Sequence, residues 1–325
     1  MTPGSIILCP GQGAQVVGMG KAWFEASEDA RAVFAAADRQ LGDRLGAPLS
    51  KLCFEGPAEV LNRTDVSQPA LYTTGIACWR AMLASGDRPV AAAAGLSLGE
   101  YTALHVAGAI SFEDGLELVT LRGRAMQDAA ESPEAMAGGG GGMVALIGGT
   151  DEQAEQIARE ARGSSGGGQV LVCANFNAPG QVVLSGHKQA CERAVKVAEA
   201  IGVKSTLLQV AGAFHSPLMA GAAERLGQAL AKTAIQAPRC TVVSNVTAQP
   251  HTPDAETIRR RLVEQLTSPV RWAQSCAWLA AQTTGAGAGG FSYVELAPGR
   301  TLMGLMRRID KSIKVDTNDV PPVAA

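Results

Sequence analysis

The sequence predicts an α/β protein whose large domain has a parallel sheet as its core and carries a smaller inserted domain. A short apolar run ends in Gly95-Leu96-Ser97-Leu98-Gly99 and a helical pattern follows, which is the strand–serine–helix order of α/β-hydrolase-like proteins. A glycine-rich stretch at 138–142, which we expect to be a flexible hinge, precedes elements in the order βαββαβ, the ferredoxin-like pattern. We therefore expect a large domain at 1–136 and 211–325 and a small domain at 137–210.

The N-terminal half alternates predicted strands and helices. Residues 5–9 form a short apolar strand that leads into a glycine-rich loop. The segment 67–84 is a long apolar helix, and Pro69 lies near its first turn, where a missing N–H is tolerated. Further helical patterns cover 19–41, part of 49–62, and 112–130, and the predicted strand 90–94 directly precedes the glycine-flanked serine.

The inserted domain follows the glycine stretch. Ser164 to Gly168 is predicted to be a solvated loop. Asn177 lies between the two middle strands, where it is either a substrate-binding side chain on the rim of a cleft or part of a plain hairpin loop. The predicted strands are 143–147, 170–175, 181–185 and 204–210, and the predicted helices are 151–162 and 188–201.

The chain then returns to the large domain through a loop around His215. A strand is predicted at 241–244, a helix at 257–266 and a last strand at 291–295. A final helix at 302–309 leads into a tail that ends in Pro321-Pro322, and we expect this tail to be disordered.

Ser97 is the candidate nucleophile. Glycines on both sides are needed where a strand turns sharply into a helix, because side chains there would clash with neighbouring backbone. The first N–H groups of the following helix have no intrahelical partner and can stabilise an oxyanion. A serine that only caps the helix is the alternative, because this short motif is a hypothesis until its partners are found.

The glycine-rich loop Pro10-Gly11-Gln12-Gly13-Ala14-Gln15 follows the first strand. Val16 stands where dinucleotide-binding loops carry a third glycine, and no Lys-Ser/Thr pair follows, so both kinds of nucleotide loop are disfavoured. The loop can instead bring a backbone N–H to the active site of a neighbouring strand, or it can be a tight turn only.

The chain has four histidines, and His215 is the best candidate base. It lies in a loop before a helix, where functional side chains are commonly presented. His105 is eight residues from Ser97, about 12 Å along a helix, too far for proton transfer. His187 begins a helix and His251 lies in a polar loop. Elimination therefore assigns the general base to His215.

Arg122 lies within the predicted helix 112–130, beside Leu118 and Leu121. Helical spacing alone predicts that Arg122 is a surface arginine whose aliphatic stem covers the core.

Composition excludes several classes of protein. The 28 basic and 30 acidic residues leave a net charge of −2, which provides no overall field for nucleic acid or an anionic membrane. No apolar stretch approaches the roughly 20 residues of a membrane span. The seven cysteines are scattered without a C-x-x-C pair, which predicts reduced thiols with neither a disulfide framework nor a zinc site.

Six stretches in order along residues 5–310 resemble one family, the malonyl-CoA:acyl carrier protein transacylases of fatty acid synthesis. Together they are far more specific than the serine motif alone. The stretches are Pro10 to Gln15, Gly95-Leu96-Ser97-Leu98-Gly99-Glu100-Tyr101, Leu121-Arg122-Gly123-Arg124-Ala125-Met126-Gln127, Ala213-Phe214-His215-Ser216, Gln265 to Trp272, and Glu295 to Gly299.

The resemblance implies a division of roles. Ser97 would be the nucleophile and His215 its base, and the backbone N–H groups of Gln12 and Leu98 would form the oxyanion hole. Arg122 would hold the free carboxylate of the malonyl group, for which a planar guanidinium with paired donors is suited.

Two further residues take roles from the same resemblance. Gln265 would orient the histidine through its backbone carbonyl, in place of the aspartate of a triad. Phe214 resembles the malonyl-preferring version of its loop, where its bulk would disfavour an α-methyl branch.

The sequence departs from the family pattern at two positions. Leu96 replaces the usual histidine and Ala14 the usual serine, and Leu96 puts in doubt any role of the lost histidine in orienting substrate. Both residues resemble the plant and green algal version. We therefore expect a chloroplast stroma enzyme whose transit peptide is absent from this chain, with the bacterial cytoplasm as the alternative.

The resemblance predicts transfer of malonyl from malonyl-CoA to the phosphopantetheine thiol of acyl carrier protein, without a cofactor or metal. The expected partners are acyl carrier protein and CoA, with no nucleic acid or membrane, and we expect a monomer. A serine thioesterase or esterase is the first alternative, although it would have a histidine near its C-terminal end and His251 is the last one here. A non-catalytic carrier-protein-binding module is the second.

Overall fold

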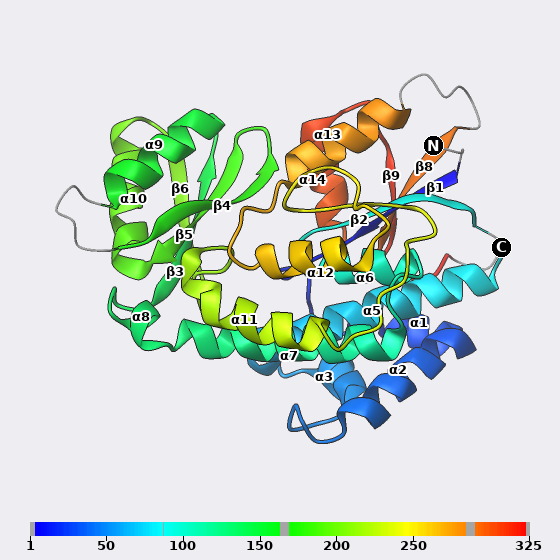
Figure 1. Ribbon diagram of the computed structural model, residues 1–325. Helices are drawn as coiled ribbons and strands as arrows, with labels where there is room; N and C mark the ends of the chain where they lie inside the picture. Colours follow the sequence, from blue (N-terminus) through cyan, green and yellow to red (C-terminus); the bar gives the residue numbers. More distant parts are fainter. Residues whose placement is uncertain (1–3, 87, 163–168, 284–289, 323–325) are drawn as a thin grey trace.

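The computed structural model describes residues 4–86, 88–162, 169–283 and 290–322, which fold around two β-sheets (Figure 1). The larger sheet is parallel and the smaller sheet is antiparallel, which confirms the predicted fold class. The predicted loop at 164–168 lies outside the described residues.

The large sheet has the strand order β7-β2-β1-β8-β9. All its neighbours pair in parallel, so the carboxyl ends of the strands lie along one edge. Cys9 pairs with Gly95, so the loops after β1 and β2 begin side by side. The strands are β1 (Gly4–Cys9), β2 (Val90–Gly95), β7 (Thr241–Val243), β8 (Phe291–Leu296) and β9 (Val315–Asn318).

Helices cover both faces of this sheet (Figure 1). They are α1 (Lys21–Ala26), α2 (Glu28–Leu41), α3 (Leu49–Glu55), α4 (Ala58–Leu61), α5 (Thr64–Ala84), α6 (Gly99–Val106), α7 (Phe112–Ala130), α8 (Pro133–Met136), the 3₁₀ helix η1 (Pro217–Met219), α11 (Ala220–Leu230), α12 (Ala255–Glu264), α13 (Trp272–Thr283) and α14 (Thr301–Ile309).

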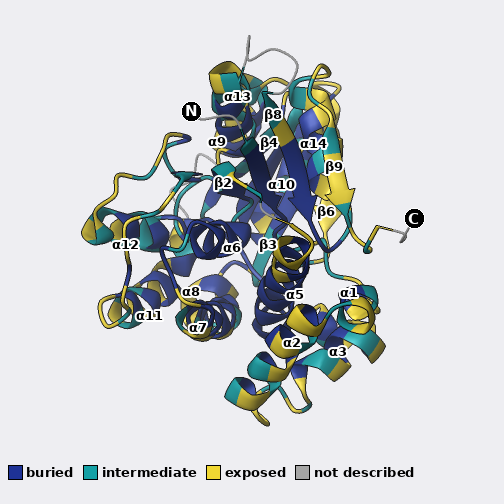
Figure 2. Cartoon of the chain, turned by 90° about the vertical axis from the view of Figure 1, so that its right-hand side faces the viewer, coloured by how far each residue is buried: buried dark blue, intermediate teal, exposed yellow. Residues whose placement is uncertain are grey.

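Helix α5 is buried along almost its whole length between the sheet and the helices α2 and α7 (Figure 2). Two glycines in α7 allow the close packing: a Cβ at Gly115 would lie 1.8 Å from the hydroxyl of Tyr72, and one at Gly123 would lie 2.6 Å from the carbonyl oxygen of Thr64. This contact brings Arg122 of α7 against the first turns of α5.

The small sheet has the order β4-β5-β3-β6 with every pair antiparallel, and α9 and α10 pack on it. The chain order is βαββαβ, as the ferredoxin-like pattern predicts. The elements are β3 (Gly141–Ile147), α9 (Asp151–Ala161), β4 (Leu171–Ala178), β5 (Gln181–His187), α10 (Lys188–Ala200) and β6 (Lys204–Leu208).

Backbone hydrogen bonds join the small sheet to the segment before α13. The N–H of Phe176 donates to the carbonyl of Val270, and the N–H of Val270 donates to the carbonyl of Ala174, at 2.9 and 2.8 Å. Strand β4 is therefore held against the large domain, and its side chains can reach the edge of the large sheet.

Five local expectations differ from the structure. The pattern at 19–41 is two helices, because Ser27 ends α1 and caps α2. Helix α5 begins at Thr64, so Pro69 lies inside it and not in its first turn. The stretch at 138–142 is not all hinge, because β3 begins at Gly141. The tail contains β9, which pairs with β8, and the unpredicted helix α13 precedes β8.

Candidate active site

Ser97 lies in the sharp turn between β2 and α6. Its φ of 52° is in the left-handed region, which is uncommon for a residue with a side chain. A Cβ at Gly95 would lie 1.9 Å from the backbone of Gly99, and a Cβ at Gly99 would lie 2.1 Å from the carbonyl oxygen of Cys9. The two flanking glycines are therefore a steric requirement of the turn, and the turn exposes the hydroxyl to the cavity described below.

His215 faces that hydroxyl. Its Nε2 lies 2.8 Å from the Oγ of Ser97, and its Nδ1 lies 2.8 Å from the carbonyl oxygen of Gln265. A carbonyl only accepts, so Nδ1 carries the proton and donates to it, and the lone pair of Nε2 points to the serine hydroxyl.

Burial, together with the positive charge of Arg122, lowers the pKa of His215 to about 4, against a smaller opposing effect of the Gln265 carbonyl. His215 is therefore neutral near pH 7 and can accept the proton of Ser97.

Arg122 is buried, with 1% of its surface exposed, so its interpretation as a surface arginine is wrong. Its NH1 donates to the Oε1 of Gln68 at 2.7 Å, and its NH2 donates to the Oγ of Ser97 at 3.0 Å and the Oε1 of Gln265 at 2.9 Å. Its Nε is buried and has no partner among the described residues. Burial lowers the pKa of Arg122, and Tyr101 and Glu100 oppose that shift.

Two backbone N–H groups flank the serine. Leu98 follows Ser97 at the start of α6, and Gln12 lies in the loop after β1. Within the described part of the chain, neither N–H donates a hydrogen bond. The N–H of Leu96 donates to the carbonyl of Cys9 at 3.0 Å, and this bond holds the two loops together.

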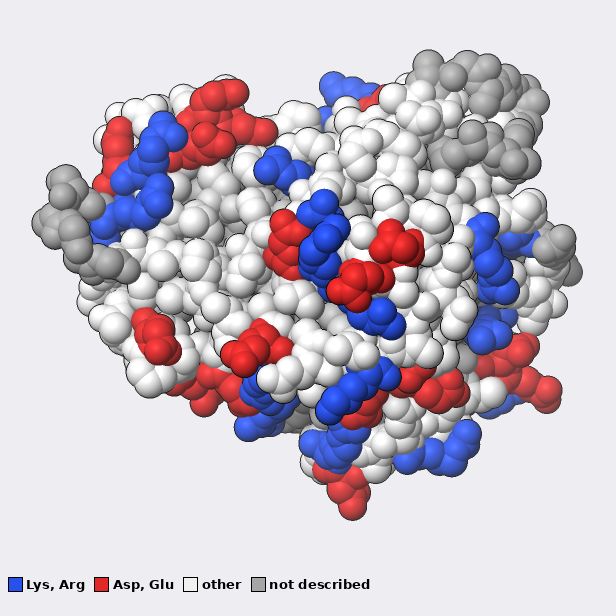
Figure 3. Space-filling model, viewed as in Figure 1, with Lys and Arg blue, Asp and Glu red and all other residues white. Residues whose placement is uncertain are grey.

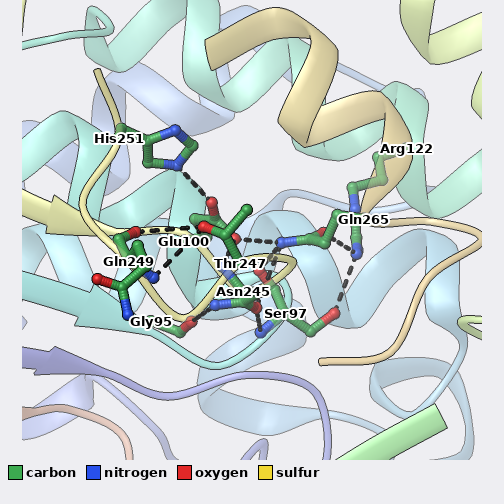
Figure 4. A network of polar contacts seen from close by, with 9 residues as sticks. All are labelled: Gly95, Ser97, Glu100, Arg122, Asn245, Thr247, Gln249, His251 and Gln265. Carbon is green, nitrogen blue, oxygen red and sulfur yellow. Dashed lines mark hydrogen bonds and ion pairs between the residues drawn. The ribbon is translucent and has the colours of Figure 1, made fainter. Parts of the chain in front are cut away.

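A second layer of buried polar groups supports this constellation (Figure 4). Asn245, two residues after the end of β7, accepts from the N–H of Ser97 through Oδ1 at 2.7 Å and donates through Nδ2 to the carbonyl of Gly95 at 2.7 Å. Glu100 accepts from the side-chain amide of Gln265 at 2.7 Å and from His251 at 2.6 Å.

Sequence reasoning missed Asn245, Glu100, His251 and Gln68 as parts of this site. Position alone could have found Asn245, because it follows a strand at the carboxyl edge of a parallel sheet, where ligand sites form. Glu100 follows directly after the second glycine of the turn. His251 and Gln68 carry no comparable signal, since only the folded chain brings them near the serine.

A cavity of about 550 Å³ opens over Ser97 and His215. Phe214 and Asn177 line it, as does Leu96. Asn177 is a residue of β4 and not of a hairpin loop, and its Oδ1 is buried without a hydrogen-bond partner among the residues that the structure describes. The other lining residues are Gln12, Gly13, Gln15, Asn62, Met126, Met143, Asn175, Val183, Leu208, Gln209, Val210 and Ala211.

The described lining of the cavity contains no Lys, Arg, Asp or Glu side chain. On the outer face seen in Figure 3, by contrast, side chains of both charges are interspersed. Arg122 is not among the described lining residues, but its NH2 donates to the hydroxyl of Ser97 from a buried position next to the cavity.

The remaining histidines do not contact the serine. His105 is a core residue whose Nδ1 lies 3.0 Å from the carbonyl oxygen of Ile110, and burial lowers its pKa to about 4. The Nδ1 of His187 accepts from the N–H of Val170 and its Nε2 donates to the carbonyl of Glu134. The predicted exclusion of these two residues agrees with their positions.

The described residues show neither a metal site nor a membrane-spanning helix. Across 4–86, 88–162, 169–283 and 290–322, no cluster of three or more His, Cys, Asp or Glu side chains is arranged to hold a metal ion. None of the described helices is long and apolar enough to cross a membrane. The seven cysteines are free thiols.

Comparison with known proteins identifies the family. A family model described as an acyl transferase domain matches residues 6–298. A malonyl CoA-acyl carrier protein transacylase of Salmonella typhimurium is 42% identical over 313 residues, which cover 96% of this chain and 94% of that protein.

Solved structures agree with that result. A malonyl-CoA:acyl carrier protein transacylase from Xanthomonas oryzae has a TM-score of 0.88 at 41% identity and covers 99% of this chain, which covers 96% of it. A malonyl-transacylase solved in complex with its type II PKS acyl-carrier protein has a TM-score of 0.88 at 36% identity, with coverages of 98% and 96%. This chain therefore belongs to the malonyl-CoA:acyl carrier protein transacylases of the acyl transferase domain family, the family that its six ordered motifs resemble.

Proposed function

We propose that this chain transfers the malonyl group from malonyl-CoA to the phosphopantetheine thiol of acyl carrier protein through a malonyl-Ser97 ester. One observation carries the proposal. The Oγ of Ser97 lies 2.8 Å from a neutral imidazole nitrogen and 3.0 Å from a buried guanidinium nitrogen. A nucleophile, a base and a cation for a carboxylate thus meet at one oxygen atom.

In the first half-reaction, Nε2 of His215 takes the proton of Ser97 while Oγ attacks the thioester carbonyl. The N–H groups of Gln12 and Leu98 are free to bind the resulting alkoxide. The C–S bond then breaks, and His215 returns the proton to the departing CoA thiolate. Such an oxyanion donor contributes about 3–4 kcal/mol and a general base about 10²- to 10⁴-fold in rate.

Arg122 binds the malonyl carboxylate in this proposal. Its NH1 is taken by Gln68, whereas its Nε is an unused donor and its NH2 already faces the serine. The Nε–NH2 edge can therefore take a carboxylate side-on with two parallel hydrogen bonds. An acetyl group has no carboxylate and gains nothing from this edge.

In the second half-reaction, CoA leaves and the pantetheine thiol of the carrier protein enters the same cavity. His215 deprotonates this thiol, and the thiolate attacks the malonyl ester. The ester C–O bond then breaks, and His215 returns the proton to the Oγ of Ser97. Amide side chains such as Asn177, with its unpartnered Oδ1, are suited to the two amides of a pantetheine arm. Phe214, on the cavity wall, would crowd a branched acyl group.

We also propose that the product serves type II fatty acid synthesis and that the chain acts as a monomer without a cofactor. The named organisms of the relatives are bacteria, which supports the bacterial cytoplasm over the chloroplast stroma as its location. The plant-like residues Leu96 and Ala14 are the argument for the chloroplast.

Intact-protein mass spectrometry after brief mixing with malonyl-CoA tests the proposal. We expect an adduct of malonyl mass that maps to Ser97, is absent from Ser97→Ala and disappears when holo acyl carrier protein is added. Release of free malonate at the rate of transfer would show a hydrolase instead. The absence of any adduct would show a non-catalytic carrier-binding module.

A further inference from the structure

A buried carboxylate–imidazole pair lies behind the reacting groups. The Oε1 of Glu100 lies 2.6 Å from the Nε2 of His251, and 1% and 0% of these two side chains are exposed. The Nδ1 of His251 has no hydrogen-bond partner among the described residues. Within the described residues, the imidazole ring of His251 therefore hydrogen bonds only to Glu100. Among the described residues neither side chain hydrogen bonds to the hydroxyl of Ser97, although the backbone N–H of Glu100 donates to the carbonyl of Ser97 at 3.0 Å. The proposed mechanism uses neither side chain.

The other oxygen of Glu100 sets the orientation of an amide. Its Oε2 accepts from the Nε2 of Gln265 at 2.7 Å and from the N–H of Asn245 at 3.1 Å. A carboxylate only accepts, so the NH₂ group of Gln265 must face Glu100. The same NH₂ group also donates to the carbonyl of Ser97 at 3.1 Å and to the Oδ1 of Asn245 at 3.3 Å, both longer than its bond to Glu100. The Oε1 of the same amide then faces Arg122 and accepts from its NH2 at 2.9 Å.

The reverse orientation would be unfavourable. If the amide of Gln265 turned over, its NH₂ group would meet the guanidinium of Arg122, which can only donate. Arg122 would lose an acceptor and would no longer be held at its 3.0 Å contact with Ser97. An uncompensated buried charge is costly, so the guanidinium would move to find another partner.

We propose that Glu100 is a positioning residue, anchored by His251, which fixes the amide of Gln265 so that Arg122 is held ready for acyl groups with a free carboxylate. Its effect is on the choice of acyl group and not on the proton transfer itself. This inference rests on the proposed function, because it takes Arg122 as the carboxylate-binding residue.

The test compares self-acylation by malonyl-CoA with self-acylation by acetyl-CoA, each measured as kcat/KM, in variants of the full chain. Glu100→Ala removes the nearest of the three acceptors of the Gln265 NH₂ group and the only charged one among them, and we expect the malonyl-to-acetyl ratio to fall about tenfold or more. Glu100→Gln keeps an acceptor for Gln265 if its own NH₂ turns to His251, so we expect it to keep the ratio within about threefold. A purely structural role would lower both rates equally and leave the ratio unchanged.

Two further variants keep the result decisive if Glu100→Ala does not fold. We expect His251→Ala to lower the ratio by about threefold and His251→Gln, which retains an N–H donor, to restore it. His105→Ala is the matched control, since it removes a buried imidazole outside this network. We expect it to lower the melting temperature and leave the ratio unchanged.

An unchanged ratio in both Glu100→Ala and His251→Ala would overturn the positioning role. Arg122→Ala, measured alongside, separates that failure from a failure of the proposed function. If Arg122→Ala lowers the ratio and the other variants do not, only the positioning role is wrong. If Arg122→Ala also leaves the ratio unchanged, its role in carboxylate binding is wrong and the positioning role falls with it.

Discussion

The two sheets of this protein differ in what they bury. At the carboxyl edge of the parallel sheet, Glu100, Arg122 and Gln265 are buried together in one connected network. Between β3 and β6, the buried polar side chains of the described residues are only Ser185 and His187, and the core around Ile157 is apolar. Buried polar groups are thus concentrated in the large domain, whereas the small sheet contributes Met143, Asn177 and Val183 to the wall of the cavity.

The largest effect is expected at the base. His215→Ala should lower kcat/KM for malonyl-CoA by about 10²- to 10⁴-fold, because Ser97 loses its proton acceptor. Stopped-flow or quenched-flow acylation measures it. His105→Ala, also buried but in contact with the rings of Tyr72 and Phe112, should leave kcat/KM within about threefold. A similar loss in both variants would contradict the assignment of the base.

Arg122→Ala should reduce malonyl transfer about 100-fold more than acetyl transfer, because only malonyl has a carboxylate to lose its partner. Arg122→Lys should recover little of the difference, since a point charge does not reproduce a side-on pair of donors. Acylation rates with the two thioesters measure both effects. Equal losses for malonyl and acetyl would show that the buried guanidinium has no carboxylate role.

Ile157→Ala tests whether the apolar core of the small sheet contributes to stability and not to the reaction. This side chain is fully buried in the core of the small sheet, so its truncation should lower the free energy of unfolding by about 2–5 kcal/mol. The kcat/KM of the folded enzyme at 25 °C should not change. Urea unfolding measures the loss of stability, and acylation kinetics measure kcat/KM. A loss of kcat/KM at unchanged stability would show that the core of the small sheet takes part in the reaction.

Acid should destabilise the protein through its buried imidazoles. Burial lowers the pKa values of His105 and His215 from 6.5 to about 4, so below pH 6.5 the unfolded chain binds protons that the folded chain does not. Each histidine thus contributes on the order of 3 kcal/mol to the free energy of unfolding. This contribution is complete above pH 6.5 and is lost as the pH falls to about 4. Urea unfolding across this range measures it, and His105→Ala should show a shallower fall than the unchanged protein.

The smallest effect is expected on the cavity wall. Asn177→Ala removes a side-chain amide whose Oδ1 accepts no hydrogen bond from the described residues. The free energy of unfolding should therefore be nearly unchanged. KM for malonyl-CoA or carrier protein should rise about three- to tenfold, with kcat within about twofold. Steady-state transfer assays measure both constants. A large fall in kcat would mean that the small domain takes part in the chemistry.

Local patterns predicted much of this molecule. The helix at 112–130 and the βαββαβ order follow from the spacing of apolar residues, which reflects which face of each element is buried. The role of Ser97 was inferred from the flanking glycines, because the geometry of the turn depends on residues next to it. The six motifs predicted the family, which the comparisons confirm.

Other features depend on contacts between distant segments. Strand β9 forms in a tail without a strong pattern, because β8 offers it an unpaired edge. Arg122 has the helical spacing of a surface residue, yet α5 covers it through close packing at Gly123. Asn177 belongs to β4 because that strand stays paired with β5 as far as Ala178.

The sequence alone determined the family and the order of helices and strands in the two sheets, and it predicted Ser97 as the nucleophile, since turn sterics and hydrophobic periodicity act over a few residues. Only the tertiary structure decided which polar groups surround Ser97. The pair of Glu100 and His251 joins positions 151 residues apart, and the contact of Arg122 with Gln265 spans 143. Burial leaves such groups no water to bind, so the folded packing, and not the local sequence, selects their partners.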